Sequence, residues 1–309
     1  MKKIVQFIRD ENIRGLASIR EEGWLNNADF LGMTPLMAAC YYNSPAIVEH
    51  IISRGADLNA RCTAQLTALH YAVLSGEHDI SQDESLFLEE SPGEYRLTNY
   101  AINSSPDNNE LFRMARGNYP SPEKVSVEKK KEIIRILSDA GADMNPMSLT
   151  FLTPLYCAVM NSEIETADEL LKCAASFTSS GMNPADYINI AIINEDEETL
   201  KFILSKNPEI NLKDRLGGTP LALASGSERI NLTKLLLKAG ADPELPGHNN
   251  MTPLMCAVLN EDEEMIRLLI ENGADPAYET DEGASALEYA EGYDKRKAVA
   301  VLKEYMEKR

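Results

Sequence analysis

The chain has 309 residues, of which 44% are hydrophobic and 26% charged, a composition that excludes an intrinsically disordered chain. Its 30 basic and 49 acidic residues give a formal net charge of −19, so we expect neither a nucleic acid nor an anionic membrane as partner. The five cysteines lack the spacing of a disulfide framework, which favours a reducing compartment.

The chain begins with two short apolar-periodic stretches, 4–8 and 13–19, which predict two short helices before Gly23. Lys2 and Lys3 are similar to the start of an export signal, but polar residues from Gln6 onward interrupt the apolar run. No apolar run approaches the roughly 20 residues that a membrane helix needs. We therefore expect a cytoplasmic protein that does not contact a membrane.

One short string recurs along the rest of the chain, as Thr34-Pro35-Leu36, Thr153-Pro154-Leu155, Thr219-Pro220-Leu221 and Thr252-Pro253-Leu254. Steps of 33 residues from these strings also reach Thr67, Asp186 and Ser285. Only the interval from Thr67 to Thr153 is longer, by an insertion of 53 residues. The predicted repeats are 33–66, 67–147, 153–185, 186–218, 219–251, 252–284 and 285–309, with the insertion at about 76–127.

Each repeat predicts a pair of helices. The opening Thr or Ser caps the first helix, a role that Asp186 can also fill. The proline after it removes no hydrogen bond, because the amide at that position would be unpaired in any case. Position five after the opening residue is alanine in every repeat, which implies close approach of neighbouring helices. The seven alanines are Ala39, Ala72, Ala158, Ala191, Ala224, Ala257 and Ala290.

The second helix of a repeat ends at position 21, usually at a glycine such as Gly240 in the left-handed conformation. Asn207 can adopt the same backbone conformation in the fourth repeat. Ala174 in the third repeat cannot do so without strain, so we expect an irregular joint between the third and fourth repeats.

The insertion at about 76–127 separates the two helices of the second repeat, and the second helix is predicted to resume at about Glu128. It contains four prolines, polar runs and several aromatic residues. Three interpretations stay open: a mobile surface loop, an ordered flap packed on the repeats, or a dedicated binding element. A loop of this length is usually either functional or disordered.

Acidic clusters lie at 161–165, 194–198 and 260–264, each at the turn between paired helices. Carboxylates there complement the dipole of the second helix. Alternatively, the stacked clusters form an acidic edge that attracts a basic protein. A calcium site is a third alternative, although the alternating ligands and central glycine of an EF-hand are missing.

The repeat pattern resembles the ankyrin repeat over about residues 24–305. The motifs that carry the resemblance are Thr67-Ala68-Leu69-His70-Tyr71-Ala72 and Gly55-Ala56-Asp57-Leu58-Asn59. The resemblance implies one all-α solenoid domain over 1–309, built from stacked helix-turn-helix repeats with hairpin-like loops. Residues 1–32 and the last repeat would cap its ends, as an array requires. In such a repeat His70 is expected to bond the backbone of the neighbouring turn.

The same resemblance implies a non-catalytic protein-interaction module that holds a protein partner on its concave face. No histidine has a metal-ligand spacing and no phosphate-binding loop or nucleophile motif occurs, so we expect no enzyme, metal or cofactor. Two other functions stay open: an inhibitory or immunity-type subunit that neutralises a basic enzyme, and a secreted effector that occupies a host protein. We take a monomer as the default.

Ankyrin partners are commonly contacted by the hairpin tips and by positions seven and eight of each repeat. In the first three repeats these positions carry aromatic and apolar side chains, which anchor interfaces well. The predicted partner-binding residues are Phe30, Met33, Tyr41, Tyr42, Leu74, Phe151 and Met160, with Asn161 and Asn194 as polar groups. Alternatively, position seven belongs to a half-buried core.

Overall fold

The computed structural model describes residues 1–20, 23–29, 31–75, 125–149, 151–179, 181–214, 216–280 and 283–307. These ranges are helical and contain no strand beyond one antiparallel bridge between Glu279 and Ser285, which confirms the all-α prediction. The chain divides into two compact units, the first ending at Gly181 and the second beginning at Met182. Among the described helices, none is both long enough and apolar enough to cross a bilayer.

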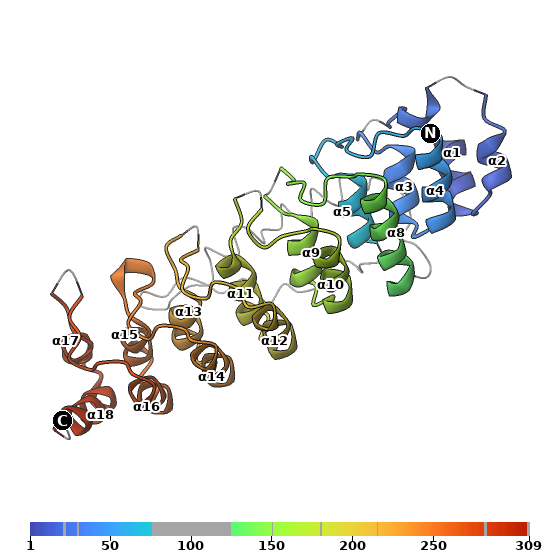
Figure 1. The fold of residues 1–309 in the computed structure, drawn as a ribbon. Coiled ribbons are helices and arrows are strands. Elements are labelled where there is room, and N and C mark those ends of the chain that lie inside the picture. The colour runs from blue at the N-terminus through green and yellow to red at the C-terminus, as the bar shows by residue number, and fades with distance from the viewer. Residues whose placement is uncertain are drawn as a thin grey trace. The chain divides into compact units, whose positions relative to one another are not determined.

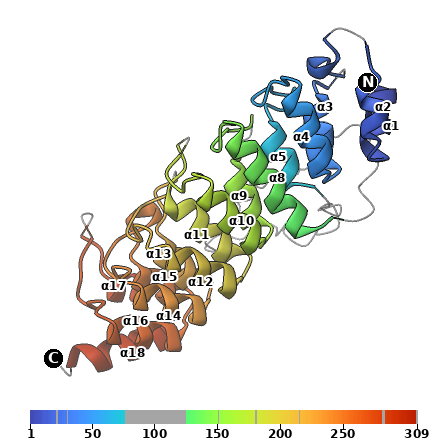
Figure 2. The ribbon, with the colours of Figure 1, turned by 45° about the vertical axis from the view of Figure 1, so that its right-hand side comes forward.

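In the first unit the helices pack as pairs in chain order: α1 with α2, α3 with α4, α5 with α8, and α9 with α10 (Figures 1 and 2). Their bounds are α1 Lys2–Arg9, α2 Ile13–Ala17, α3 Pro35–Tyr41, α4 Pro45–Ser53, α5 Ala68–Val73, α8 Val127–Asp139, α9 Pro154–Met160 and α10 Ile164–Lys172, with a short 3-10 helix η1 at Trp24–Asn26. The two short helices predicted before Gly23 are confirmed as α1 and α2.

The second unit has the same pairing: α11 with α12, α13 with α14, α15 with α16, and α17 with α18. Their bounds are α11 Pro184–Ile193, α12 Glu197–Ser205, α13 Pro220–Gly226, α14 Ile230–Lys238, α15 Pro253–Leu259, α16 Glu263–Glu271, α17 Ala286–Gly292 and α18 Arg296–Glu307, with a 3-10 helix η4 at His248–Asn250. Helix pairs therefore repeat along each unit.

The predicted N-caps form as expected in most repeats. The hydroxyl of Thr153 accepts a hydrogen bond from the amide of Tyr156 at 3.1 Å, and that of Ser285 accepts one from the amide of Glu288 at 3.2 Å. Each bond satisfies an amide that has no partner inside the helix, and such a cap contributes about 1 kcal/mol.

The fourth repeat differs, and the prediction of Asp186 as its N-cap is wrong. Helix α11 begins one turn earlier, at Pro184, with Asn183 as the cap that accepts from the Ala185 amide at 2.8 Å. Asp186 is the third helical residue, and its carboxylate accepts the Asn183 amide at 2.8 Å, which closes a capping box. The Asn-Pro pair is itself a helix-start signal that the fixed 33-residue step passes over.

The seven alanines at position five are all completely buried. They lie on the first helices, which pack against each other from repeat to repeat, α3 against α5 in the first unit and α13 against α15 in the second. A larger side chain at these positions would force neighbouring helices apart, and such overpacking typically costs about 1–3 kcal/mol. The prediction of close helix approach is confirmed.

Polar side chains in the loops join each repeat to the next, a feature that the sequence analysis did not identify. One side-chain oxygen per loop accepts the amide of an aspartate or serine in the following loop. These bonds are Asn26 to Asp57 (3.0 Å), Asn59 to Asp143 (2.9 Å) and Asn145 to Ser176 (2.9 Å) in the first unit, with Asn211 to Asp242 (2.9 Å) and Glu244 to Asp275 in the second. The loops are therefore held at a fixed spacing within each unit.

The interrupted second repeat is closed by a buried lysine. Residues 76–124 lie outside the described part of the chain, and α8 begins at Val127, one residue before the predicted start. The Lys130 ammonium donates to the Val73 carbonyl at 2.7 Å and to a Glu163 oxygen at 2.5 Å. Because Val73 is the last residue of α5 and Glu163 holds the N-cap position of α10, the Lys130 side chain joins three helices.

His70 fixes the turn of the neighbouring repeat, as predicted. Its Nδ1 accepts the Thr67 amide at 3.2 Å, so the ring proton lies on Nε2, which donates to the Leu152 carbonyl at 3.1 Å. Burial of the ring lowers the pKa of His70 to about 4, because a charged imidazolium would lose its hydration.

This burial predicts a specific acid sensitivity. As pH falls from about 6.5 to about 4, the unfolded chain takes up a proton at His70 that the folded chain rejects, so folding loses up to about 3 kcal/mol. His70→Gln removes this titration but leaves every carboxylate in place. In urea titrations between pH 7.5 and 4.5, the stability difference between wild type and variant should shrink steadily on acidification. Parallel pH profiles would contradict the role assigned to His70.

Ala174 takes the left-handed conformation, with a φ of +67°, at the position where other repeats have glycine. Asn207 does the same with a φ of +52°, as predicted. The Ala175 amide still reaches the Leu170 carbonyl at 2.9 Å, so the helix ends normally while the alanine carries the strain.

Ala174→Gly should therefore stabilise the protein by about 1 kcal/mol, since relief of the left-handed strain exceeds the entropy cost of glycine. The matched control is Ala140→Gly, at a helix end with a φ of −76°, which should be destabilising by about 0.5–1 kcal/mol. Chemical denaturation of both variants measures the two signs. A loss of stability in both variants would show that Ala174 is not strained.

Candidate functional site

Several predicted contact residues belong to the core. Met33, Tyr41 and Leu74 are buried, Tyr41 with only 2% of its surface exposed. Tyr41 ends α3, which packs between α1 and α5, so its ring is covered from both sides. The prediction of these three as partner-binding residues is corrected, because in this fold they have almost no surface to offer. The core alternative for position seven applies to Tyr41 and Leu74.

The remaining predicted residues lie in separate places. Tyr42, Met160 and Asn161 are partly exposed at the C-terminal ends of α3 and α9. Phe151 is exposed beyond the opposite end of α9, one helix length or about 10 Å away. Asn194 is exposed in the second unit, and Phe30 lies outside the described residues.

The loop ends of the first unit form three hairpins with the same closing bond. The Asp29 amide donates to Met33 (3.1 Å), the Cys62 amide to Leu66 (3.0 Å), and the Ser148 amide to Leu152 (2.9 Å). Adjacent hairpins are also joined through their backbones: the Thr63 amide donates to Leu31 at 2.9 Å, and the Leu149 amide to Ala64 at 3.0 Å. We call the described residues of 29–33, 62–66 and 148–152 the tip ridge.

The tip ridge is held rigidly. A side chain at Gly32 would place its Cβ 2.9 Å from the Cα of Cys62, so only glycine permits this approach of the two hairpins. The Arg61 guanidinium spans the other junction and donates to the Met147 carbonyl at 2.7 Å. The backbone of the ridge thus needs little ordering on binding, which lowers the entropy cost of association.

Phe151 combines a left-handed backbone with an exposed aromatic ring. It has a φ of +63° at a hairpin position where Gly32 and Gly217 have values of +83° and +86°. Its side chain is 52% exposed, and Leu149 on the same hairpin is 57% exposed. A bulky residue in the left-handed region costs about 1–2 kcal/mol, and an exposed apolar side chain returns little stability.

The acidic clusters are used within the fold. Asp196 and Asp262 cap α12 and α16, each accepting an amide at 3.0 Å, which confirms the helix-end role for these two residues. Glu195 pairs with Arg229 at 2.7 Å, and Glu264 with Lys234 at 3.5 Å. Much of the negative charge along this edge is therefore balanced by the chain's own basic residues.

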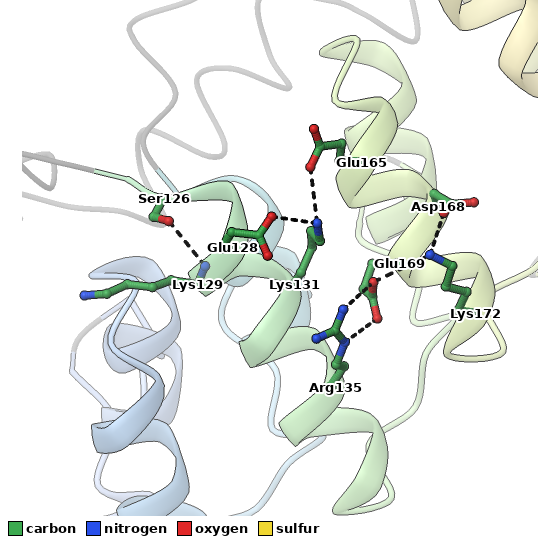
Figure 3. A network of polar contacts seen from close by, with 9 residues as sticks. All are labelled: Ser126, Glu128, Lys129, Lys131, Arg135, Glu165, Asp168, Glu169 and Lys172. Atoms are coloured by element: carbon green, nitrogen blue, oxygen red, sulfur yellow. Dashed lines mark hydrogen bonds and ion pairs between the residues drawn. The ribbon is translucent and has the colours of Figure 1, made fainter.

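Figure 3 shows the densest part of this pairing, between α8 and α10. Arg135 donates two hydrogen bonds to Glu169, Nε to Oε1 at 2.5 Å and Nη2 to Oε2 at 2.9 Å. Lys131 forms an ion pair with Glu165 at 3.2 Å. The Arg135 hydrogen bond lowers the pKa of Glu169, so this carboxylate stays charged. The outer helices of these two repeats are thus linked by matched charges.

Position eight has a structural role in one repeat. The Asn260 amide group donates to the Gly226 carbonyl at 2.6 Å and so joins two helix ends of the second unit. Asn161 and Asn194 hold the same position in their repeats, and their role in specificity stays a prediction. Among the described residues, no three His, Cys, Asp or Glu side chains are grouped as a metal site requires.

Comparison with known proteins identifies the fold. The family model described as ankyrin repeats (3 copies) matches residues 4–82, 124–214, 188–280 and 221–308. A putative ankyrin repeat protein of Rickettsia felis is 32% identical over 126 residues, which is 41% of this chain and 43% of that protein. The human transient receptor potential cation channel subfamily A member 1 is 26% identical over 133 residues, 43% of this chain and 11% of the channel protein.

The chain spans less than half the length of these curated relatives. Among solved structures, the ankyrin repeat domain of Bcl-3, a member of the IkappaB protein family, matches with a TM-score of 0.61 and 18% identity, covering 88% of this chain and 99% of that domain. A likeness at this identity concerns the fold alone. It confirms the predicted stacking of ankyrin helix pairs.

Proposed function

The chain belongs to the ankyrin repeat family, and we propose that it binds a protein partner on its concave face, with the tip ridge of the first unit as the main contact. Ankyrin repeat domains are generally protein–protein interaction modules. The proposal also holds the protein to be non-catalytic. None of its five cysteines, all of which are among the described residues, forms a disulfide, which supports a reducing location such as the cytoplasm.

The conformation of Phe151 carries this proposal. Four glycines take the equivalent hairpin position with positive φ, Gly32, Gly181, Gly217 and Gly283, so the fold itself favours glycine there. A phenylalanine with its ring half in solvent worsens both the backbone energy and the solvation of the folded chain. Backbone strain of this kind clusters at functional sites, and at Phe151 it is combined with an exposed aromatic ring.

The chemistry of the ridge fits a protein partner. Leu149 and Phe151 together offer an apolar contact, and aromatic anchors bury much area while losing little rotamer freedom. The rigid backbone bonds beneath them reduce the ordering cost. Tyr42 and Met160, at the far ends of the inner helices, would extend the contact along the concave face.

Phe151→Gly separates function from folding. The variant should gain about 1 kcal/mol in stability, because glycine relieves the left-handed strain, and should lose affinity for the partner by about tenfold or more. The matched control is Gln65→Gly, at the same position of the neighbouring hairpin, with a φ of +59°. It should gain stability similarly and keep its affinity. Denaturant titration measures stability, and calorimetry with the partner purified by affinity capture measures binding.

Two results would contradict the proposal. One is a Phe151→Gly variant that is more stable and binds the captured partner unchanged. The other is equal loss of binding in Phe151→Gly and Gln65→Gly, which would assign the effect to hairpin geometry and not to the aromatic ring.

A further inference from the structure

We propose that Asn272, at the C-terminal end of α16, is a site of spontaneous deamidation that the folded chain protects, and that its conversion loosens the contact between α16 and α18. Asn272 precedes Gly273, and this is the one place in the 309 residues where a glycine follows an asparagine. The inference concerns the second unit alone and does not depend on the tip ridge or on a partner.

The reaction needs only these two residues and water. The backbone nitrogen of Gly273 attacks the side-chain carbonyl carbon Cγ of Asn272, and a new N–C bond forms. The Cγ–Nδ2 bond breaks, the proton of the attacking nitrogen passes to the leaving group, and ammonia departs. Water then opens the resulting succinimide ring at either carbonyl, which gives aspartate or isoaspartate. Because glycine has no side chain to hinder its nitrogen, an asparagine before glycine reacts most readily.

The end of α16 keeps the two reacting groups apart. Asn272 is the C-cap, with a ψ of 16°. A ψ near zero places the Gly273 nitrogen beside the backbone nitrogen of Asn272 and away from its Cβ, so the ring cannot close without rotation of the backbone. That rotation is opposed by two hydrogen bonds: the Asn272 Nδ2 donates to the Leu268 carbonyl at 2.8 Å, and the Gly273 amide donates to the Ile270 carbonyl at 3.1 Å.

Geometry and not burial therefore provides the protection. Asn272 and Gly273 are both exposed, so water reaches them freely. Gly273 has a φ of +109°, the left-handed conformation in which a glycine commonly ends a helix. Ends of helices open locally at a lower free energy than the whole domain. The rate of conversion should thus follow the fraction of molecules in which the last turn of α16 is open.

The last turn of α16 also holds α18. The Tyr305 hydroxyl donates to Glu271 at 2.9 Å, and Arg267 pairs with Glu304 at 2.9 Å. These two contacts join the second helices of the last two repeats. A repeat at the end of an array depends on its one neighbour, so a change at the end of α16 affects the packing of α18.

Both products of the reaction disturb this turn. Aspartate lacks the Nδ2 donor that bonds the Leu268 carbonyl, and it places a negative charge at the negative end of the helix dipole. Isoaspartate in addition lengthens the backbone by one carbon directly before Gly273. Because the reaction is irreversible in water, converted molecules accumulate with time.

Mass spectrometry of the full-length chain tests the protection. The chain is incubated at neutral pH and 37 °C, once folded and once unfolded in guanidinium chloride, beside a synthetic peptide of residues 268–279. Conversion is measured in tryptic peptide 268–295, whose single asparagine is Asn272. The unfolded chain should convert at the rate of the synthetic peptide, and the folded chain at least about tenfold more slowly.

Hydrogen exchange tests the consequence. The variant Asn272→Asp reproduces the aspartate product, and amides in peptides covering 263–274 and 296–307 should exchange about fivefold faster than in wild type. The control is Asn249→Asp, which makes the same change of charge at an exposed residue of η4 and should leave both peptides unchanged.

Three results would overturn the proposal. The first is a folded chain that converts at Asn272 as fast as the synthetic peptide, since the fold would then give no protection. The second is an unfolded chain that does not convert there. The third is an Asn272→Asp variant whose exchange matches that of wild type or of Asn249→Asp, since conversion would then leave α16 and α18 undisturbed.

Discussion

The fold depends on the close approach of neighbouring first helices, which the seven buried alanines at position five make possible. Because only small side chains allow such contact, each first helix packs closely against the neighbouring first helices. This close packing explains why Tyr41 and Leu74 are core residues. On the hairpins of the first unit, Leu149 and Phe151 keep exposed apolar side chains.

Hydrogen bonds and ion pairs also join neighbouring repeats, in addition to the close packing at the alanines. The asparagine bonds between successive loops, the Lys130 clamp across the interrupted repeat and the Arg135–Glu169 pair all join one repeat to the next within a unit. Several of the 49 acidic residues, such as Glu163 and Glu169, form ion pairs of this kind. Carboxylates of the acidic clusters such as Glu163 and Glu195 are therefore used in ion pairs within the fold.

Sequence reasoning was most successful where the residue type dictates the backbone. Thr153 and Ser285 cap helices, Asn207 adopts the left-handed backbone conformation, and His70 hydrogen-bonds the next loop. In each case the residue type at that position of the repeat strongly favours the observed role. A fixed period failed at Asp186, where a local Asn-Pro signal starts the helix a turn earlier.

Two kinds of feature could not be predicted from the sequence. Whether position seven is core or surface depends on the helices packed on both sides of it, as Tyr41 shows. The loop-to-loop bonds of Asn59 and Asn145 join residues that are 84 and 31 positions apart, so no local pattern indicates them. The strain at Phe151 likewise becomes visible only when its φ is compared with those of the other hairpins.

The central claim is that the partner binds the tip ridge, because the helix surfaces are already used in packing and ion pairs within the fold. Hydrogen exchange of the full chain, with and without the partner purified by affinity capture, tests it most directly. The account predicts that added protection is concentrated in peptides covering 61–66 and 147–152, with little change in α10, Ile164–Lys172. Protection centred on α10 and its ion-paired surface, with the hairpins unchanged, would contradict it.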